Sequence, residues 1–501
     1  MPSKAFSASI FGYDSKTVEV EVDILNGPAS IIIVGLGDAT VQESKERIRS
    51  AIKNSGLEYP RRKKTINLAP ANLQKHGPMF DLPIALGLLL QSEQIPQNCL
   101  AKTLIIGELA LSGELRRIHG ALAIASHAKS ENFETVILPE TNGYEASAIA
   151  GIKIIGAQNL GQLVRHLRGE EIIKPSESHS PASDFSINMP WHFEDIRGHE
   201  SAKRVLTIAA AGCHNVLLYG PPGSGKTLLA RSLQSILPML KFEQSVEVTK
   251  IYSIAGKLPN EVPLIKMPPF RAVHHTASAV SLVGGGTIPR PGEISLSHHG
   301  VLFLDELLEF PRATLDCLRQ PMEDGTVNVT RVAGSSIFPA EFILIAATNP
   351  CSCGYYGDPV KACICTPVKL EQYRKKLSGP LLDRIDLMCY VPRLPFEKFS
   401  TLTNVNSSEQ IRETVISTRK FQDARAQTTT NGKIASKLVR EFCELDAGGT
   451  QLLKEAFSKL QCSGRAYYRI LKVARTIADL ENSEKIRIHH LAEALQYRPH
   501  L

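Results

Sequence analysis

The sequence of 501 residues contains no apolar run long enough to cross a lipid bilayer, which takes about 20 residues. Its longest candidate, Leu82–Leu90, is too short and includes Pro83. The segment Met1–Ser15 has a single lysine and no apolar stretch, unlike a secretory signal peptide. We therefore expect a cytoplasmic protein that does not contact a membrane.

The sequence also lacks an export signal that would favour disulfides, so we expect its ten cysteines to stay reduced. No helix-turn-helix, RRM or zinc-finger signature is present, so no motif identifies a nucleic-acid-binding module. Apolar residues make up 43% and charged residues 21%, which is typical of a soluble globular protein. The net charge of +7 permits a polyanionic partner without requiring one.

Residues 1–168 alternate between strand and helix patterns, which predicts an α/β domain. Residues 18–24 alternate apolar and acidic side chains, as a half-buried strand does. Asn26-Gly27 then predicts a hairpin turn into a return strand at Ile31–Val34. The cations at Arg61–Lys64 indicate a solvated loop. Further strands are expected at Thr65–Leu68, Thr103–Ile106 and Thr135–Leu138, and a helix carrying Val41, Ile48 and Ile52 should end at Gly56.

The rest of the chain divides into three parts. Residues 169–190 are polar and rich in proline and serine, which indicates a flexible linker. Residues 191–395 show a strand, a glycine-rich loop, a helix and further buried strands, whereas residues 396–501 are mostly helical. Within the last part, Ser463–Leu480 places its apolar side chains, including Tyr467, on one helical face. We expect an α/β core followed by a helical domain.

A phosphate-binding loop lies between an apolar strand at Asn215–Tyr219 and an amphipathic helix. This strand–loop–helix context is the one that G-x-x-x-x-G-K-[ST] requires. Inward-facing backbone N–H groups and the helix N-terminus would bind phosphates, with the lysine on the β- and γ-phosphates and the threonine hydroxyl on Mg²⁺. The loop consists of Gly220, Pro221, Pro222, Gly223, Ser224, Gly225, Lys226 and Thr227.

Two buried strands farther along end in polar residues that suit ATP hydrolysis. The first ends at Asp305, which would hold Mg²⁺ through water, and Glu306, which would polarise the attacking water. The second ends at Asn349, which would reach the γ-phosphate or that water. Taken alone, Asn349 before Pro350 would be a strand-terminal turn residue.

Two arginines complete the pattern: Arg384, near the end of the α/β core, and Arg465, at the start of the last amphipathic helix. Without a phosphate-binding loop, each would be interpreted as a surface ion pair. Together the five elements resemble the AAA+ ATPases over residues 191–501. The resemblance implies a ring, usually a hexamer, with ATP at each subunit boundary. Arg384 would then act on the neighbouring subunit's nucleotide, and Arg465 would contact the nucleotide from the helical lid.

Five longer blocks lie in the same region: Arg271–His275, Gly284–Glu293, Ser297–Gly300, Gln320–Val327 and Val329–Ile337. They narrow the resemblance to magnesium chelatase-type AAA+ proteins, and more closely to the competence ATPase family known as ComM or YifB. That family implies a helicase-like motor that acts on single-stranded or branched DNA and migrates junctions during natural transformation. Two insertions would face the ring channel, with Arg290 and Arg331 as their basic residues. We expect the His-His pairs to support neighbouring side chains or a polar core, because adjacent histidines cannot easily share a metal.

Residues 1–168 resemble the proteolytic domain of Lon-type proteases, on the stretches Lys75–Phe80 and Gly107–Leu122. In active members a serine follows Gly-Pro and a lysine follows the second stretch, forming a nucleophile and base. Here Met79 stands at the serine position, and the lysine position falls at or near Leu122. We expect a domain that has kept the fold and lost the protease chemistry.

Four cysteines lie in the loop of residues 351–365, directly after Asn349-Pro350. Four thiolates in one loop would close a tetrahedral structural Zn²⁺ site, although C-x-C is tighter than the usual spacing. The alternative is four reduced thiols, which is unusual in a polar, glycine-rich loop. The other cysteines are expected in cores. The four are Cys351, Cys353, Cys363 and Cys365.

Three other functions remain open at this point. A chelatase-type motor would use ATP to insert Mg²⁺ into a macrocycle, an ATP-dependent protease would need a peptidase site, and a remodelling ATPase would act on a protein client. The residues at positions 79 and 122 argue against the protease. Stimulation of hydrolysis by DNA would separate the DNA motor from the others.

Overall fold

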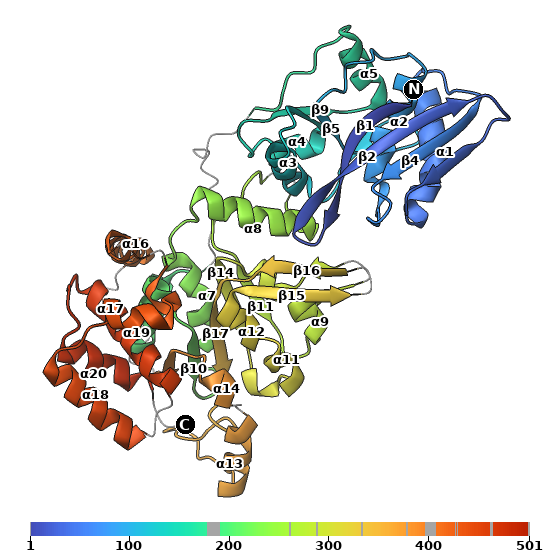
Figure 1. Cartoon of the computed structure of the whole chain (residues 1–501). Coiled ribbons are helices and arrows are strands. Elements are labelled where there is room, and N and C mark those ends of the chain that lie inside the picture. Colours follow the sequence, from blue (N-terminus) through green and yellow to red (C-terminus); the bar gives the residue numbers. More distant parts are fainter. Residues whose placement is uncertain are drawn as a thin grey trace.

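The computed structural model describes residues 2–177, 191–259, 262–286, 289–331, 334–376, 379–395, 407–425, 427, 429–460 and 464–498. Figure 1 shows an N-terminal α/β part, a second α/β part built on a parallel sheet, and C-terminal helices packed beside that second part. This α/β class is the one predicted. The proposed linker is described only as far as residue 177, because residues 178–190 lie outside the described ranges, as do residues 396–406.

The N-terminal part is a seven-stranded sheet in the order β3-β4-β2-β1-β5-β8-β9. Strands β1 and β2 form a long antiparallel hairpin, and β5, β8 and β9 extend the sheet in parallel. The helix α2 is buried along nearly its whole length, which explains its continuous apolar sequence. The elements are β1 (Ser3–Phe11), β2 (Asp14–Leu25), β3 (Ile31–Val34), α1 (Ala39–Asn54), β4 (Lys63–Ala69), η1 (Pro78–Phe80), α2 (Asp81–Gln91), β5 (Thr103–Ile105), β6 (Glu108–Leu109), β7 (Leu115–Arg116), α3 (Ala121–Ser130), β8 (Thr135–Pro139), α4 (Glu140–Ala146), β9 (Lys153–Ala157) and α5 (Leu160–Arg168).

Two expectations for this part were wrong. The strand β3 does not return along β2. It pairs in parallel with β4, and β4 takes the edge of β2. Pro28 follows the Asn26-Gly27 turn and has no N–H to donate to a hairpin ladder. Nor is Arg61–Lys64 a solvated loop throughout: Lys64 is buried in β4, where its Nζ donates hydrogen bonds to backbone carbonyls 2.7 and 2.8 Å away.

The second part is a five-stranded parallel sheet in the order β11-β14-β17-β10-β18. Two small hairpins, β12–β13 and β15–β16, stand beside it. The elements are η2 (Phe193–Asp195), α6 (Glu200–Gly212), β10 (Val216–Tyr219), α7 (Lys226–Ile236), α8 (Phe242–Ile254), β11 (Phe270–Val273), α9 (Ala279–Val283), β12 (Gly284–Gly285), β13 (Arg290–Pro291), α10 (Glu293–Leu296), β14 (Gly300–Leu304), η3 (Leu307–Glu309), α11 (Arg312–Asp316), α12 (Arg319–Asp324), β15 (Thr326–Arg331), β16 (Gly334–Pro339), β17 (Phe342–Thr348), α13 (Pro367–Lys376), α14 (Gly379–Leu382) and β18 (Leu387–Tyr390).

The C-terminal helices share a hydrophobic core with one face of this sheet, together with α6 and α7. Helix α19 lies at the centre and buries Ile470, Ala474 and Ile477. The expected apolar face is therefore confirmed, except that Tyr467 stays 37% exposed. The elements are α16 (Ser408–Ala424), η4 (Asn431–Lys433), η5 (Ser436–Leu438), α17 (Val439–Phe442), α18 (Ala447–Leu460), α19 (Gly464–Leu480) and α20 (Ile488–Gln496).

The N-terminal part docks on the second part through α8 and the β15–β16 hairpin. Ser253 on α8 donates a hydrogen bond of 2.8 Å to Glu145, and the ammonium of Lys250 lies 3.9 Å from the ring centre of Tyr13. The β1–β2 turn approaches the hairpin so closely that a Cβ on Gly12 would lie 2.2 Å from that of Ser336. Glycine is required there by both contact and its φ of 64°.

Within the described residues, no helix combines the length and the apolar character needed to span a membrane.

A buried carboxylate fixes α19 to its neighbours, which makes the helical part sensitive to one substitution. Asp479 is fully buried and accepts hydrogen bonds from Arg425, Arg475 and Asn431 at 2.6 to 3.0 Å. We expect Asp479→Asn to lower the free energy of unfolding by about 3–5 kcal/mol, because it leaves buried guanidinium charge uncompensated. Chemical denaturation monitored by circular dichroism measures the change. The control Asp423→Asn removes an exposed carboxylate and should shift the transition little; equal shifts would contradict the account.

Candidate nucleotide-binding site

The phosphate-binding loop and the polar ends of two other strands lie at one edge of the parallel sheet. Strand β17 lies between β10 and β14, and all three run in the same direction. Their carboxyl ends therefore meet, bringing together Gly220–Thr227 after β10, Asp305 and Glu306 after β14, and Asn349 after β17. The sequence predicted each of these residues from the end of a buried strand.

The backbone of the loop has the conformation that its glycines allow. Gly223 and Gly225 have φ values of 75° and 86°, in the left-handed region that most side chains avoid. The Gly220 backbone passes so close to the Val391 carbonyl that an added Cβ would lie 2.1 Å from its oxygen. Helix α7 then begins at Lys226, so its N-terminal N–H groups face the loop, which is the arrangement that binds phosphate.

Lys226 is buried inside this loop, with 9% of its surface exposed. Its Nζ donates hydrogen bonds of 2.8 Å to the carbonyls of Gly220 and Pro221, and lies 3.4 Å from the Asn349 side-chain oxygen. Burial lowers the pKa of Lys226 to about 8, although the carboxylates of Asp305 and Glu306 raise it. Burial of the Lys226 ammonium costs desolvation free energy, which a bound anion would offset. The ammonium thus lies near the position expected for a nucleotide phosphate.

The oxygens that a Mg²⁺ ion needs are also in place. The Thr227 hydroxyl donates a hydrogen bond of 3.0 Å to the Asp305 carboxylate. Hydroxyl and carboxylate oxygens are the hard ligands that Mg²⁺ prefers, together with water and nucleotide phosphates. These residues fit the ion, so Thr227 and Asp305 would hold it where it could neutralise phosphate charge.

Glu306 points away from this pair and toward a histidine. It adopts a left-handed φ of 52°, its side chain is 49% exposed, and its Oε2 lies 3.0 Å from Nδ1 of His275. His275 follows β11, whose end lies at the same sheet edge. Sequence reasoning assigned His275 no role beyond support for a neighbouring side chain. The strand β11 ends two residues before His275 and pairs with β14, which places His275 at this sheet edge. His275 is therefore a close polar neighbour of Glu306 in the structure.

The second histidine pair stabilises the polar core, as expected. Nε2 of His298 and of His299 lie 3.1 and 2.8 Å from the Glu247 carboxylate on α8. Hydrogen bonds from the two imidazoles hold the pKa of Glu247 well below its usual range. This group anchors α8, the helix that also contacts the N-terminal part, to the start of β14.

The two predicted arginines lie together, but not beside the phosphate-binding loop. Arg384 is 5% exposed, and its guanidinium lies 2.6 Å from the Glu323 carboxylate. Arg465 reaches the same Glu323 oxygen at 3.4 Å. The carbonyl of Arg384 accepts a hydrogen bond of 3.1 Å from Asn215, which precedes β10, whereas the loop follows β10. Sequence reasoning gave Glu323 no role, although it lies in the block Gln320–Val327.

The separation follows from strand geometry. Four residues of β10 lie between these two ends, and a strand rises about 3.3 Å per residue, so the ends are about 13 Å apart. An arginine side chain is too short to extend from the Asn215 end of β10 to the phosphate-binding loop at the other end. Within one chain, the structure therefore brings together the loop, Asp305, Glu306 and Asn349, and it keeps Arg384 and Arg465 at the opposite edge.

Two further groups were singled out by sequence. Met79 packs against the hydrophobic cluster that contains Leu122, so both expected protease positions carry apolar side chains in one apolar region. The four cysteines of the loop at 351–365 also converge, with their ligand atoms all within 4.8 Å of one another. Of the others, Cys389 and Cys443 are buried and Cys99, Cys213 and Cys317 are half-buried. Cys462 lies outside the described residues.

Comparison with known proteins covers most of the chain. The family model described as "Magnesium chelatase, subunit ChlI" matches residues 192–399, "Subunit ChlI of Mg-chelatase" matches residues 20–142, and the ChlI C-terminal model matches residues 405–498. The "Competence protein ComM" of Haemophilus influenzae is 43% identical over 98% of this chain and 96% of its own length.

The chain belongs to the ComM/YifB family of magnesium chelatase-like AAA+ proteins. YifB of Escherichia coli is 42% identical over 97% of this chain and 95% of its own length. The magnesium-chelatase 38 kDa subunit of Cereibacter sphaeroides is 26% identical over 33% of this chain and 54% of its own. Magnesium chelatase-family AAA+ proteins are generally ATPases, which agrees with the residues assembled at the sheet edge.

The depressed pKa of Lys226 makes a prediction about nucleotide affinity. Below pH 8 the free protein already carries the ammonium that phosphates attract, whereas above pH 8 it must first take up a proton. We expect ATP to bind about tenfold more weakly at pH 9 than at pH 7, since each pKa unit corresponds to a tenfold change. Equilibrium binding of a fluorescent ATP analogue measures this. The control Lys226→Arg stays charged and should show a flat profile; a flat wild-type profile would contradict the assignment.

Proposed function

We propose that this protein is an ATP-driven DNA motor that works as a hexameric ring and migrates branched DNA during integration in natural transformation. The observation that supports the proposal is that Arg384 lies near the start of β10 and the phosphate-binding loop at its end, in a chain similar over 98% of its length to a competence protein. Competence is the uptake of DNA, so the substrate of such a motor would be single-stranded or branched DNA.

ATP and Mg²⁺ are the cofactors that this site would use. The loop and Lys226 would bind the phosphates, Thr227 and Asp305 the ion, and Asn349 the γ-phosphate. Glu306 would polarise the attacking water once it turns away from His275.

A ring would complete the site. Glu323 pairs with Arg384 and Arg465 as an internal anion, and the triphosphate of a neighbouring subunit offers the same negative charge. Both arginines would therefore serve the nucleotide of another copy. This differs from our expectation that Arg465 contacts the nucleotide from its own lid, because here it lies beside Arg384.

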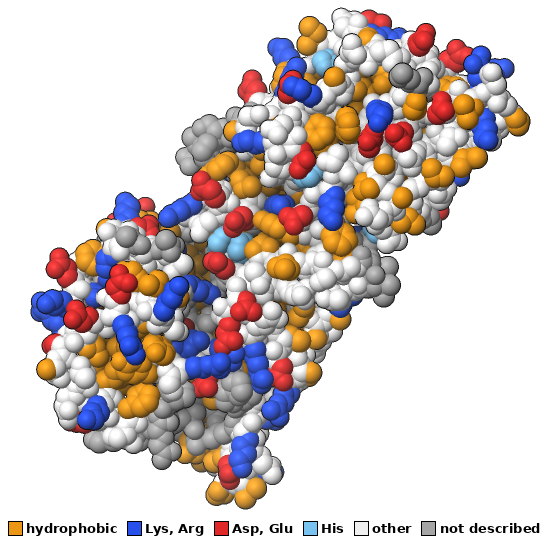
Figure 2. Space-filling view, in the orientation of Figure 1, with side chains coloured by type: hydrophobic (Ala, Val, Ile, Leu, Met, Phe, Trp, Pro, Cys, Tyr) orange, Lys and Arg blue, Asp and Glu red, His pale blue; other side chains and the backbone are white. Residues whose placement is uncertain are grey.

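Two neighbouring hairpins are the elements we propose for DNA contact. Arg331 on β15 donates a hydrogen bond of 2.9 Å to the carbonyl of Gly284 on β12, which ties the hairpins together. Arg290 on β13 is exposed. Figure 2 shows Lys and Arg side chains on the second part, interspersed with Asp and Glu as they are on the N-terminal part. Such surface cations bind a phosphate backbone independently of sequence.

For residues 1–168 we propose a Lon-protease-like domain without protease chemistry, used for assembly or DNA positioning. The apolar packing of Met79 and Leu122 supports the loss of chemistry. The docking of the β1–β2 turn on the β15–β16 hairpin supports a mechanical role, since a movement of that hairpin would displace the N-terminal domain.

A chelatase-type motor that inserts Mg²⁺ into a macrocycle is the alternative that a specific observation favours, because the descriptions of all three family models name a magnesium chelatase subunit. The chelatase subunits themselves match only about a third of this chain at 26–28% identity, whereas ComM matches nearly all of it at 43%. A remodeller of a protein client would share the same ATP site.

ATP hydrolysis with and without single-stranded and branched DNA tests the proposal. We expect DNA to stimulate hydrolysis severalfold in the wild type. We expect Glu306→Gln to reduce hydrolysis about 10²–10⁴-fold, because general-base catalysis contributes that much. Glu309→Gln, a control three residues away on the surface, should retain DNA stimulation. Hydrolysis indifferent to every DNA tested would favour the macrocycle or protein client.

The DNA contact is tested by charge reversal. Arg290→Glu should weaken DNA binding in fluorescence anisotropy and flatten its salt dependence, since a phosphate contact is lost. The control Arg61→Glu reverses an exposed cation of the N-terminal part and should leave DNA affinity unchanged. If both changes weaken binding equally, the hairpins are not the contact.

A further inference from the structure

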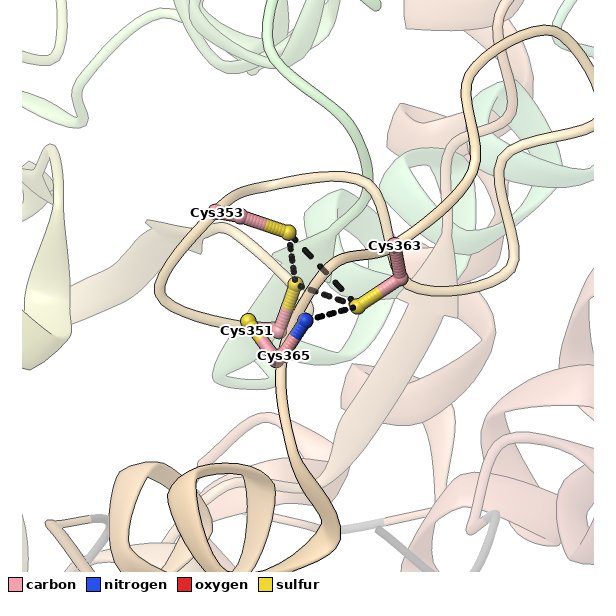
Figure 3. A group of neighbouring side chains, drawn as sticks. All are labelled: Cys351, Cys353, Cys363 and Cys365. Atoms are coloured by element: carbon pink, nitrogen blue, oxygen red, sulfur yellow. Dashed lines mark hydrogen bonds between the residues drawn. The ribbon is translucent and has the colours of Figure 1, made fainter.

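The loop after Asn349 folds its four cysteines into one closed group (Figure 3). The Sγ of Cys351 lies 3.3 Å from that of Cys353 and 3.7 Å from that of Cys363, and Cys353 and Cys363 are 3.5 Å apart. Cys365 completes the set, with all four ligand atoms within 4.8 Å of one another. These sulfurs come from both ends of the loop, so they close it on itself.

The spacing fits a single tetrahedral metal ion. Four sulfurs at about 2.3 Å from Zn²⁺ form a tetrahedron with edges of about 3.8 Å, close to the separations in the group. A disulfide would need about 2.05 Å between two sulfurs, which none of these pairs has. An iron–sulfur cluster binds each cysteine to a different corner and would hold the sulfurs farther apart.

The surrounding backbone favours thiolates. The N–H of Tyr356 donates to the Cys351 sulfur at 3.3 Å, and the N–H of Cys365 donates to the Cys363 sulfur at 3.4 Å. Hydrogen bonds to the charged form stabilise it, and orient it as a ligand. Asp358, whose side chain is fully buried, accepts the Val360 N–H at 2.8 Å and so fixes the turn between the two C-x-C pairs.

Two His-containing groups elsewhere lack the free ligand atoms that a metal site needs. Nδ1 of His298 accepts the backbone N–H of Glu341, and Nδ1 of His490 accepts that of Arg487. In a neutral imidazole the other nitrogen then carries the proton, so it has no lone pair for a metal. Their carboxylate partners are explained by hydrogen bonding alone.

The cysteine loop also touches the nucleotide site. Asn349 precedes Cys351 by two residues, and the Gly354 backbone packs on Pro222 of the phosphate-binding loop, where an added Cβ would lie 2.9 Å from the proline Cδ. The Tyr390 hydroxyl on β18 donates a hydrogen bond of 3.2 Å to the carbonyl of Gly357. The loop is therefore braced against two strands of the sheet and against the residues that hold phosphate.

We propose that Cys351, Cys353, Cys363 and Cys365 bind one structural Zn²⁺, and that this ion holds Asn349 and the phosphate-binding loop in register. Four thiols lose their protons to solvent as four Zn–S bonds form, with no change of oxidation state. The metal site stands on its own geometry, whereas its effect on hydrolysis rests on the proposed function.

Metal analysis of the full-length protein tests the site without reference to activity. We expect one zinc per chain by mass spectrometry of purified protein, and its release when a mercurial reagent titrates the thiols. Cobalt added to the stripped, reduced protein should give the absorption of a tetrahedral thiolate site. Cys363→Ser should lose the metal, and the control Cys317→Ser, outside the group, should keep it. Iron with a visible chromophore, or reduced wild-type protein that binds neither zinc nor cobalt, would overturn the site.

Hydrolysis then tests the link to the nucleotide site. Stripping zinc from the wild type should lower ATP hydrolysis about 10–100-fold, the usual effect of losing a support around a site, and restoring zinc under reducing conditions should recover it. Because the wild type is used, a misfolded variant cannot produce the result. Bound zinc whose removal leaves hydrolysis unchanged would overturn the link alone. A zinc-loaded wild type without ATPase activity would instead contradict the proposed function.

Discussion

The structure depends on the direction of one short strand. The phosphate-binding loop follows β10, whereas Asn215, which holds the backbone of Arg384, precedes it. Parallel strands collect the phosphate-binding and hydrolytic residues at one sheet edge and leave the two arginines at the other. We propose that the two ends of the sheet supply complementary halves of a hydrolytic site, and stacking of such chains head to tail would bring these halves together. Within one chain, Glu323 pairs with both arginines.

The helical part is fixed to this second edge by buried charges. Arg469 on α19 donates hydrogen bonds to the Arg384 carbonyl and to Asp386. Burial alone would raise the pKa of Asp386, but Arg469, His214 and the Asn215 amide together hold it well below its usual range. The start of α19, and with it Arg465, is thus positioned by the same residues that position Arg384. A movement of the helical part would move both arginines at once, which under the proposed function would couple ATP hydrolysis to mechanical work.

Local signals in the sequence predicted what depends on adjacent residues. The phosphate-binding loop, Asp305, Glu306 and Asn349 each follow a buried strand, and a parallel sheet necessarily places such ends together. The pairing of distant strands was harder to predict. Strand β4 pairs with β2 where β3 was expected, and no residue in 26–34 indicates that β4 takes this place. The blocks Arg271–His275 and Gln320–Val327 were singled out, but the contacts that His275 and Glu323 make were not predicted, because an ion pair between remote segments leaves no periodic pattern. Likewise, burial of Lys64 depends on carbonyls that only the folded loop supplies.

Mixing two inactive variants tests the division of the site most directly. Lys226→Ala removes the phosphate contact but keeps the arginine edge, and Arg384→Ala does the reverse. In a ring of shared sites, mixed subunits form some boundaries with an intact loop on one side and an intact arginine on the other. The account predicts that ATP hydrolysis, nearly absent in each variant alone, reappears in the mixture and peaks near equal amounts. Hydrolysis that stays absent at every ratio, although the variants assemble together, would contradict it.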